Sequence, residues 1–597
     1  MREPSKTRPA ISCGCRSTLR PSRAIIDHVR RGNGPARTYT HAYVCSVRRY
    51  ATVPRRTRRS PQGRETAMIK RTQVMVGVMV SVALVTAGCG TGANSGGSGA
   101  AGQAIAQLRV GSASVPTLDY TKSAFGYHGL GNLVLEPLLI RDPSGELKPW
   151  LAESWEQSTP TTYVYRLRKG VKFSSGNELT AEDAAYALNV YRQPGSTNAY
   201  NFPPALKSIE ATDRYTVRVT LSEPNAAWAL VPARNQLGIF EKSFYEKNKP
   251  TYGQPGTGVV GTGPWKLDTF DPTSAAKLSA NPAYWGGRVP IQGITWTFFS
   301  SETSAATAFR AKQLDVYFPQ GNRAFASTAN TKLVTAPDTR SFGQFSMNTL
   351  VPPWNDLHVR RAVAYALDKQ SLIEAWGGYA KPSDYFIPPK LLEQLGSAQE
   401  VEQALADVPT YPHDLAKAKA EMAKSAFPDG VDVTLTSGDS SAFRNVSQAV
   451  VAQLGKIGIR AKLEVQPPSA AVAKVIGPDR KAVPSFVTTV GGTSADPGAA
   501  YDFAIGSANA AEGKFNTTNW SSPKVDKLIA DGFATTEAAE RLDIYAQLNR
   551  EFADNVPFVP LFLPEATLAL SSRYSWPTFN GFFALDRPWA LGIGYAR

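Results

Sequence analysis

The sequence predicts an α/β protein with more than one domain, and three observations support this prediction. Apolar residues alternate in some segments and recur every three to four residues in others, so strands and helices are mixed along the chain. Residues 431–465 have the pattern of a strand, a helix and a second strand, which favours a βαβ unit in a parallel sheet. About 500 residues follow position 88, more than one hydrophobic core normally supports.

The elements are predicted in order from local patterns. Tyr163, Tyr165 and Leu167 share one face of a strand at 161–169, and a similar alternation predicts a strand at 215–221. Both are short and alternate cleanly, as expected for strands buried on one face.

Helix signals follow the same logic. Thr180 and Asp183 form a variant of the capping box and predict a helix that runs through Arg192. A second helix is predicted at 359–376. Its apolar side is formed by Val359, Val363, Ala366 and Leu367. The βαβ stretch divides into a strand at 431–436, a helix at 442–457 and a strand at 459–465.

The net charge of +16 is confined to the leader. Residues 1–88 hold 18 Lys and Arg against 3 Asp and Glu, which leaves a net charge of +1 on the rest of the chain. A nearly neutral body has no basic footprint for nucleic acid, so we expect no nucleic-acid partner.

Residues 68–88 have the order of a secretory signal peptide. A positive start is followed by an apolar stretch too short to span a bilayer and by small residues before Cys89. These small residues resemble a bacterial lipobox, although Thr86 stands where that pattern prefers Leu. We expect lipid attachment at Cys89 and a flexible Gly/Ser tether at 89–102. The alternative is a free Cys89 after an ordinary signal peptide.

Residues 1–67 precede this signal and are Arg-rich. They are interpreted as an untranslated or disordered extension, with Met68 as the expected start, and an Arg-rich transit segment is the alternative.

The body of the chain offers little for metal or disulfide chemistry. The four cysteines of the whole sequence are Cys13, Cys15, Cys45 and Cys89, so the chain after the leader holds Cys89 alone. No disulfide is therefore expected after position 89, and the scattered His128, His358 and His413 do not have the spacing of a zinc site. We expect neither a metal nor a cofactor.

Six segments, in order, resemble a known family. The residues are L-K-P-W-L-A-E-S-W-E with the Y-R-L-R-K-G-V-K-F…T-A-E-D that follows it (147–183), G-T-G-P-W-K-L (261–267), N-P-A-Y-W-G-G (281–287), F-S-M-N-T…R-R-A-V-A-Y-A-L-D-K (345–369), D-L-A-K-A-K (414–419) and V-D-K-L-I (525–529). The chain resembles the extracellular solute-binding proteins of family 5, the oligopeptide, dipeptide and nickel binders of ABC importers.

The resemblance implies a two-lobed, periplasmic-binding-protein-like fold of the large peptide-binder class (type II), closing about a hinge. Lobe one is expected at 103–350, with an inserted subdomain at about 150–256 and a C-terminal return at 556–597. Lobe two is expected at 351–555.

The resemblance also implies where a ligand is held. The predicted contact residues are Ser114, Pro116, Thr117, Phe345, Asn348, Gly491, Thr493, Asp496 and Phe562. In dipeptide-binding relatives an aspartate binds the free amino group of the ligand, and Thr493 stands at the aligned position here. A hydroxyl cannot make the charge-assisted bond of a carboxylate, which places peptides with a free amino terminus in doubt. Asp496 could take that role or could be a turn residue before Pro497.

Two motifs resemble those of enzymes, but neither has the sequence context that the enzyme requires. The G-x-G-x-x-G at 256–261 is followed by Pro264 instead of a helix, and Pro523 interrupts the S-x-x-K of a penicillin-recognising enzyme at 521–524. The prediction is a non-enzymatic, monomeric lipoprotein on the outer face of the bacterial cytoplasmic membrane, in the extracellular or periplasmic space. It would capture a peptide or peptide-like solute and deliver it to an ABC permease. Two alternatives remain open: a binder of a metal chelate, haem-like or other small molecule, and a scaffold that binds protein only.

Overall fold

The computed structural model describes residues 103–122, 128–142, 146–319, 325, 330–337, 341–491, 496–581 and 587–596. The leader, Cys89 and the tether lie outside these residues, as does Thr493. Residues 93–597 form one compact unit. Among the described helices, none combines the length and apolar character needed to cross a membrane.

Within the described residues, twelve strands join one mixed sheet in the order β16-β15-β17-β13-β18-β11-β1-β10-β9-β8, and β12 and β14 also pair with β18. Its strands are β1 (Ile105–Ala113), β8 (Trp265–Asp271), β9 (Ala275–Ala280), β10 (Ile291–Phe299), β11 (Val316–Tyr317), β12 (Thr331–Pro337), β13 (Ser341–Met347), β14 (Ala380–Pro382), β15 (Val431–Gly438), β16 (Ile459–Gln466), β17 (Ser485–Gly491) and β18 (Phe558–Ser571).

Three smaller sheets accompany it, with the orders β4-β5-β7-β6, β2-β3 and β19-β20. Their strands are β2 (Leu139–Arg141), β3 (Leu147–Pro149), β4 (Ala152–Thr159), β5 (Thr162–Leu167), β6 (Leu206–Asp213), β7 (Thr216–Leu221), β19 (Tyr574–Ser575) and β20 (Gly594–Tyr595).

Helices cover both groups of strands. The α-helices are α1 (His128–Gly131), α2 (Ala181–Tyr191), α3 (Lys242–Asn248), α4 (Glu302–Arg310), α6 (Leu357–Ala366), α7 (Lys369–Trp376), α8 (Pro389–Leu392), α9 (Ala398–Leu405), α10 (Leu415–Lys424), α11 (Ser441–Gly455), α12 (Pro468–Ile476), α13 (Pro497–Ile505), α14 (Pro523–Ala534) and α15 (Ala538–Asn555). The 3₁₀ helices are η1 (Ala199–Asn201), η2 (Ala226–Ala233), η3 (Asn235–Leu237), η4 (Arg480–Ala482), η5 (Ser507–Asn509) and η7 (Trp589–Gly592).

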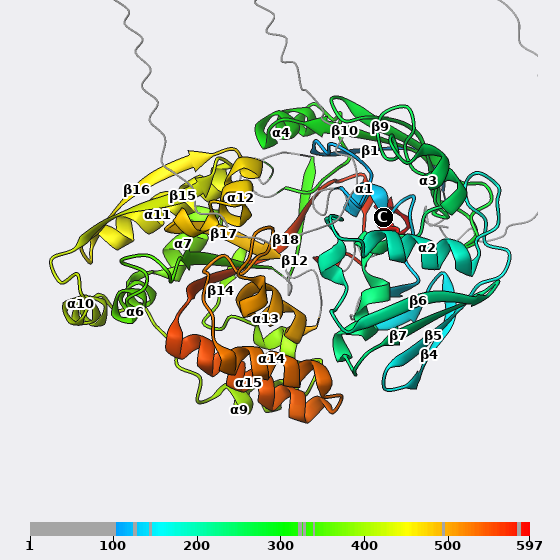
Figure 1. The fold of residues 1–597 in the computed structure, drawn as a ribbon. Coiled ribbons are helices and arrows are strands. Elements are labelled where there is room, and N and C mark those ends of the chain that lie inside the picture. Colours follow the sequence, from blue (N-terminus) through cyan, green and yellow to red (C-terminus); the bar gives the residue numbers. More distant parts are fainter. Residues whose placement is uncertain are drawn as a thin grey trace, which may run out of the picture. The chain divides into compact units, whose positions relative to one another are not determined.

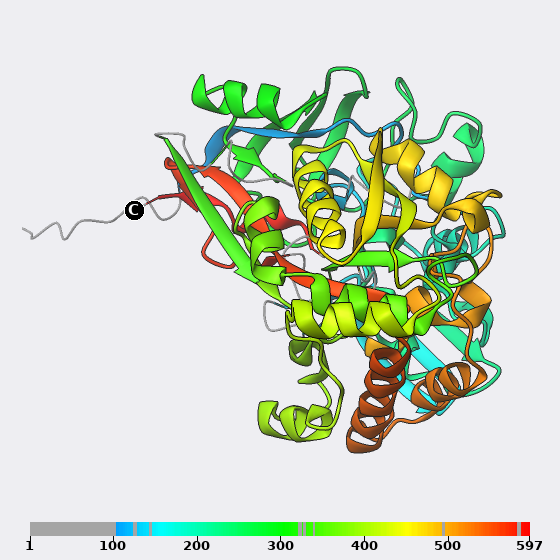
Figure 2. The same ribbon diagram turned by 90° about the vertical axis from the view of Figure 1, so that its left-hand side faces the viewer.

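The strand β18 joins two lobes. Its first half pairs with β13 and β14, up to Pro564, and its second half pairs with β12 from Glu565 onward. The view in Figure 1 places β12 and β18 between the two groups of elements, and Figure 2 shows the same long strands from the side. The predicted two-lobed α/β fold is therefore confirmed, with each lobe built on its own part of the sheet.

The predicted boundary between the lobes at 350 stays a prediction, and packing favours a division a few residues earlier. Phe345 and Met347 of β13 lie in the same hydrophobic core as Leu435 and Val450 of the predicted lobe two. The first half of β18 pairs with β13 and β14, and its second half pairs with β12. The sequence does not mark this division, because β18 runs through it without a break.

The local predictions are mostly confirmed. The predicted βαβ unit is β15, α11 and β16, with β15 and β16 parallel. Thr180 and Asp183 form the predicted capping box of α2. The helix predicted at 359–376 is instead two helices, because Leu367 is extended and Asp368 caps α7 by accepting from the N–H groups of Gln370 and Ser371. An Asp before a helical stretch is an N-cap signal that the apolar pattern concealed.

Candidate functional site

The loop after β1 presents two of the predicted contact residues at the surface. Ser114 and Pro116 are exposed, and the Ser114 hydroxyl donates to the carbonyl of Pro272 at 2.5 Å. Thr117 is buried, donates to the carbonyl of Gly253 at 3.1 Å, and accepts from the Asp119 N–H and from Gln254 Nε2. Its hydroxyl therefore fixes the loop, while Ser114 and Pro116 remain accessible.

The loop between β17 and α13, which carries the predicted contacts Gly491, Thr493 and Asp496, is described only at its two ends. Gly491 closes β17 opposite Ser341, and the next described residue is Asp496. Asp496 is 2% exposed; it caps α13 by accepting from the Ala499 N–H at 3.1 Å and accepts from Arg541 Nη2 at 2.5 Å. Both carboxylate oxygens are thus engaged within lobe two, so the interpretation of Asp496 as a helix cap and turn residue replaces that of an anchor for a ligand amine.

Two predicted aromatic contacts are part of the lobe-two core. Phe345 is fully buried and packs edge-on against Trp354 with ring centroids 5.7 Å apart. Phe562 is also buried, 5.2 Å from the ring of Trp376, and covers Gly343, where a side chain would collide with it. Both side chains therefore contribute to the packing of lobe two, and their role as ligand contacts stays a prediction. All seven residues of β13 are buried, so its sequence carries no alternation that separates core from cleft.

Asn348 is likewise a structural residue. Its amide donates to the carbonyls of Lys481 and Val483, at 2.8 and 3.0 Å, and its carbonyl oxygen accepts from Leu350 N–H and Asn519 Nδ2. This buried side chain joins the end of β13 to the start of β17 and to the 516–519 loop. Its amide makes four hydrogen bonds in this structure, and its contact with a ligand stays a prediction.

Three aromatic rings that the sequence did not single out connect the lobes. Tyr200 of η1, in lobe one, lies 6.1 Å from Phe503 of α13 and 6.4 Å from Phe515, both in lobe two. Phe503 and Phe515 stack on each other at 4.5 Å. The phenylalanines lie near Asp496 in sequence, but no local pattern links them to position 200.

A second group of aromatic residues lines a pocket within lobe one, with a volume of about 230 Å³. Its wall residues are Ile140, Trp150, Trp576, Thr578, Arg587, Pro588, Trp589, Leu591 and Gly592. Trp576 and Trp589 have ring centroids 5.4 Å apart, and Arg587 supplies positive charge. Trp150 belongs to the family-like motif at 147–183, and the two tryptophans near the C-terminus, Trp576 and Trp589, were the available signal for the rest.

Behind Trp150 lies a buried carboxylate, Glu136. It accepts hydrogen bonds from four side chains, at 2.8 to 3.1 Å. The donors are Trp150 Nε1, Thr262 Oγ1, Tyr284 Oη and Trp285 Nε1. Burial raises the pKa of Glu136 to about 7, against the four hydrogen bonds, which lower it. This cluster holds two of the family-like motifs, 261–267 and 281–287, against the start of the inserted sheet.

The motifs considered for catalysis are occupied by structural contacts. Ser521 donates to Ser507 Oγ, and Lys524 forms an ion pair with Glu551, so the two residues of the S-x-x-K do not pair with each other. No helix follows the G-x-G-x-x-G, because 259–264 are irregular and β8 begins at Trp265. Among the described residues, no group of three or more His, Cys, Asp and Glu side chains could hold a metal ion.

Comparison with known proteins supplies the context for this architecture. Residues 146–512 match the model of the bacterial extracellular solute-binding proteins, family 5 Middle. A glutathione-binding protein of Salmonella choleraesuis is 29% identical over 489 residues, covering 79% of this chain and 90% of the relative. These similarities extend over both lobes.

Two solved structures share the fold. The DppA protein of Helicobacter pylori, in complex with the peptide STSA, has a TM-score of 0.71 at 20% identity, covering 83% of this chain and 99% of that protein. The AgaA protein of A. tumefaciens R10, in complex with agropinic acid, has a TM-score of 0.70 at 23% identity, covering 82% of this chain and 99% of that protein. The same fold thus holds a peptide in one protein and agropinic acid in the other.

Proposed function

Because the chain belongs to family 5 of the bacterial extracellular solute-binding proteins, we propose that it captures a peptide or peptide-like solute and delivers it to the permease of an ABC importer. The observation that carries the proposal is the pair of lobes joined through β18, since closure of two lobes about shared strands encloses a solute. The similarity to a glutathione-binding protein, itself a binder of a small peptide, supports the ligand class.

The residues of the loop at 491–497 limit which class of peptide we expect the protein to bind. Asp496 is engaged by Arg541 and by the cap of α13, which supports its interpretation as a turn residue over that of a partner for a ligand amine. With Thr493 in place of the aspartate of dipeptide-binding relatives, we propose that the amino group is not held by a carboxylate in this loop. Peptides whose amine is blocked suit such a site better than ordinary peptides, because they carry no ammonium that needs a charge-assisted bond. Ser114, Pro116 and Gly491 stay in the proposed contact set.

The proposed cellular setting is a lipid-anchored monomer outside the cytoplasmic membrane. Residues 68–88 would direct export, Cys89 would carry the lipid and 90–102 would serve as the tether. Mass spectrometry of the protein from its own cells tests this: we expect a lipid-modified residue at Cys89, and Cys89→Ser should release the protein into the medium or periplasm. An unmodified N-terminus at another position would contradict the anchor.

The ligand is tested by native mass spectrometry of the protein purified gently from its source cells, followed by identification of what denaturation releases. We expect a peptide or peptide-like compound. Reduced glutathione, an ordinary tripeptide and its N-acetyl form then serve as probes in a thermal-shift assay, in which the N-acetyl form should raise the melting temperature more than the ordinary tripeptide does. A protein that arrives empty and responds to none of these probes would contradict the peptide proposal.

One observation favours a second candidate, a non-peptide solute with a flat apolar part and an acidic group. The pocket is lined by Trp576 and Trp589, which are 4% and 1% exposed and pack against each other, and by Arg587, whose charge suits an acid. Trp576→Leu separates the two candidates. It should abolish binding of a flat acidic probe such as indole-3-acetate and leave peptide binding unchanged, whereas equal loss of both would show that the variant has damaged the lobe.

A further inference from the structure

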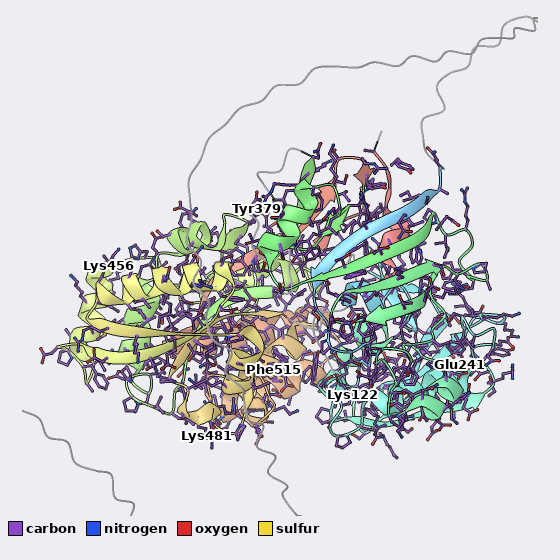
Figure 3. The ribbon with its side chains drawn as sticks, turned by 90° about the horizontal axis from the view of Figure 1, so that it is seen from above. Lys122, Glu241, Tyr379, Lys456, Lys481 and Phe515 are labelled. Atoms are coloured by element: carbon purple, nitrogen blue, oxygen red, sulfur yellow. The ribbon has the colours of Figure 1, made fainter. Side chains whose placement is uncertain are left out.

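The aromatic contact between the lobes is small and well defined. Tyr200 contributes one ring from lobe one, and Phe503 and Phe515 contribute a stacked pair from lobe two, with an interplanar angle of 18°. Figure 3 shows Phe515 and Lys122 on the two sides of the boundary between the lobes. Ring pairs with centroids 4.5 to 7 Å apart attract each other, so this contact favours the arrangement in which the lobes meet.

On the lobe-one side, the ring of Tyr200 is tied to the segment that carries Ser114 and Pro116. The amide of Asn198 donates to the carbonyl of Tyr120 at 2.6 Å, and the N–H of Thr197 donates to the carbonyl of Thr121 at 2.8 Å. Tyr120 and Thr121 lie three and four residues after Thr117, whose hydroxyl accepts from the N–H of Asp119 in the same loop. A shift of the loop after β1 is therefore transmitted to Tyr200.

On the lobe-two side, a single helix makes the corresponding connection. Phe503 lies in the last turn of α13, and Asp496 caps the first turn of the same helix directly after the loop that contains Thr493. The ion pair from Asp496 to Arg541 anchors that end to α15. Because a nine-residue helix moves as a rigid body, the position of the loop sets the position of Phe503.

From this connectivity we propose that Tyr200 is a positioning residue: it latches the lobes together through Phe503 and Phe515 without touching the solute. The proposal rests on the proposed function, since a latch serves a protein that opens and closes around a ligand. Both sides of the ring contact are attached to segments proposed to contact the ligand. A bound solute that fixes the position of these segments therefore also places the three rings in contact. The latch shifts the equilibrium towards the closed arrangement and slows release.

The first test needs no ligand. All four cysteines lie within residues 1–89, so their replacement by serine in the full chain leaves Lys247→Cys and Lys456→Cys as sites for spin labels, one on each lobe. Both residues are exposed. Distances between the labels are measured by pulsed electron paramagnetic resonance in the labelled parent and in Tyr200→Ala. We expect the variant to gain a longer-distance population. A distribution identical to that of the parent would overturn the latch.

The controls separate a latch from a general loss of packing. Tyr200→Phe keeps the ring and should retain the parent distances. Tyr186→Ala removes a tyrosine of the same inserted region whose ring contacts, with Phe240 and Tyr245, stay inside lobe one. It should lower the melting temperature without changing the distance distribution. If Tyr200→Ala does not fold, Phe503→Leu tests the contact from the opposite lobe and should give the same longer distances.

The second test uses reduced glutathione, the ordinary tripeptide and its N-acetyl form as probes. For whichever of them binds, Tyr200→Ala should raise the dissociation rate by about threefold to tenfold, the loss expected for one or two ring contacts, and leave the order of the affinities unchanged. A changed order would mean that Tyr200 contacts the solute, which would overturn the positioning role. If no probe binds even the parent, the proposed ligand class fails, and the distance measurement still decides the latch.

Discussion

Each lobe buries a carboxylate among aromatic rings, and the two carboxylates are stabilised in different ways. In lobe one, Glu136 accepts from four neutral donors, and it forms no ion pair with any residue that the structure describes. In lobe two, Asp496 is paired with the buried guanidinium of Arg541, which lies over the ring of Tyr545. A carboxylate held by neutral donors can be protonated without leaving a buried charge unpaired. Protonation of a carboxylate that is paired with a buried cation leaves that cation without its counter-charge. We therefore expect the lobes to respond differently to substitution and to pH.

The largest effect is expected from breaking the ion pair. Arg541→Met leaves Asp496 buried beside no cation, which should destabilise lobe two by about 3–5 kcal/mol. Chemical denaturation followed by circular dichroism measures the loss. The double variant Arg541→Met with Asp496→Ala removes the uncompensated charge and should be more stable than the single variant. Equal stability of the two would show that the charge is not the source of the loss.

The next effect is a dependence of stability on pH that comes from lobe one. Since the pKa of Glu136 is raised to about 7 in the folded protein from its ordinary 4.5, the folded state holds the proton more tightly than the unfolded state. The stabilisation is complete below pH 4.5 and is lost as the pH rises through 7, a change of at most about 3 kcal/mol. Glu136→Gln should flatten this part of the profile. A parent protein that gains stability between pH 5 and 8 would contradict the assignment, provided that the Gln variant shows the same gain.

A smaller change sharpens the role of the neutral donors. Thr262→Val keeps the shape of a fully buried side chain and removes one hydrogen bond to Glu136. We expect a loss of about 1 kcal/mol at pH 8, where the carboxylate is charged, and a smaller loss at pH 5. Equal losses at both pH values would show that the threonine contributes packing only.

The smallest effect is expected at the surface. Arg460 and Asp432 form an ion pair between β15 and β16 with most of both side chains exposed to solvent. Arg460→Gln should leave the denaturation midpoint unchanged within error, because solvent screens such a pair. A clear shift would mean that exposed charges matter more in this sheet than the comparison of the two buried carboxylates assumes.

The fold was predictable from the sequence where the signal is local. Alternation located β5 and β7, the capping box located α2, and the βαβ pattern gave β15, α11 and β16 with their parallel pairing. The break between α6 and α7 was missed because the apolar side continues across Asp368. The N-cap signal of Asp368 acts within one helical turn, and in the sequence prediction it was given less weight than an apolar pattern that extends over several turns.

The candidate site was predictable only in part, because its residues meet through tertiary contacts. Ser114 and Pro116 are exposed, whereas Phe345, Asn348 and Phe562 are buried, and the contact of all five with a ligand stays a prediction. In strands buried on both faces, an apolar residue looks the same whether it faces a core or a cleft. The contact between Tyr200 and Phe503 joins positions about 300 residues apart, and no sequence pattern marks it.

The strand β18 also constrains how this protein can change. One run of 14 residues serves as a sheet strand for both lobes, with the transfer between Pro564 and Glu565. Insertion of a single residue in either half would turn every following side chain to the opposite face of the sheet. Recombination therefore cannot exchange lobe two as a separate unit, because its last strand continues directly into a strand of lobe one. A change of ligand specificity is therefore expected in the loops proposed to contact the ligand, while the length of β18 stays the same.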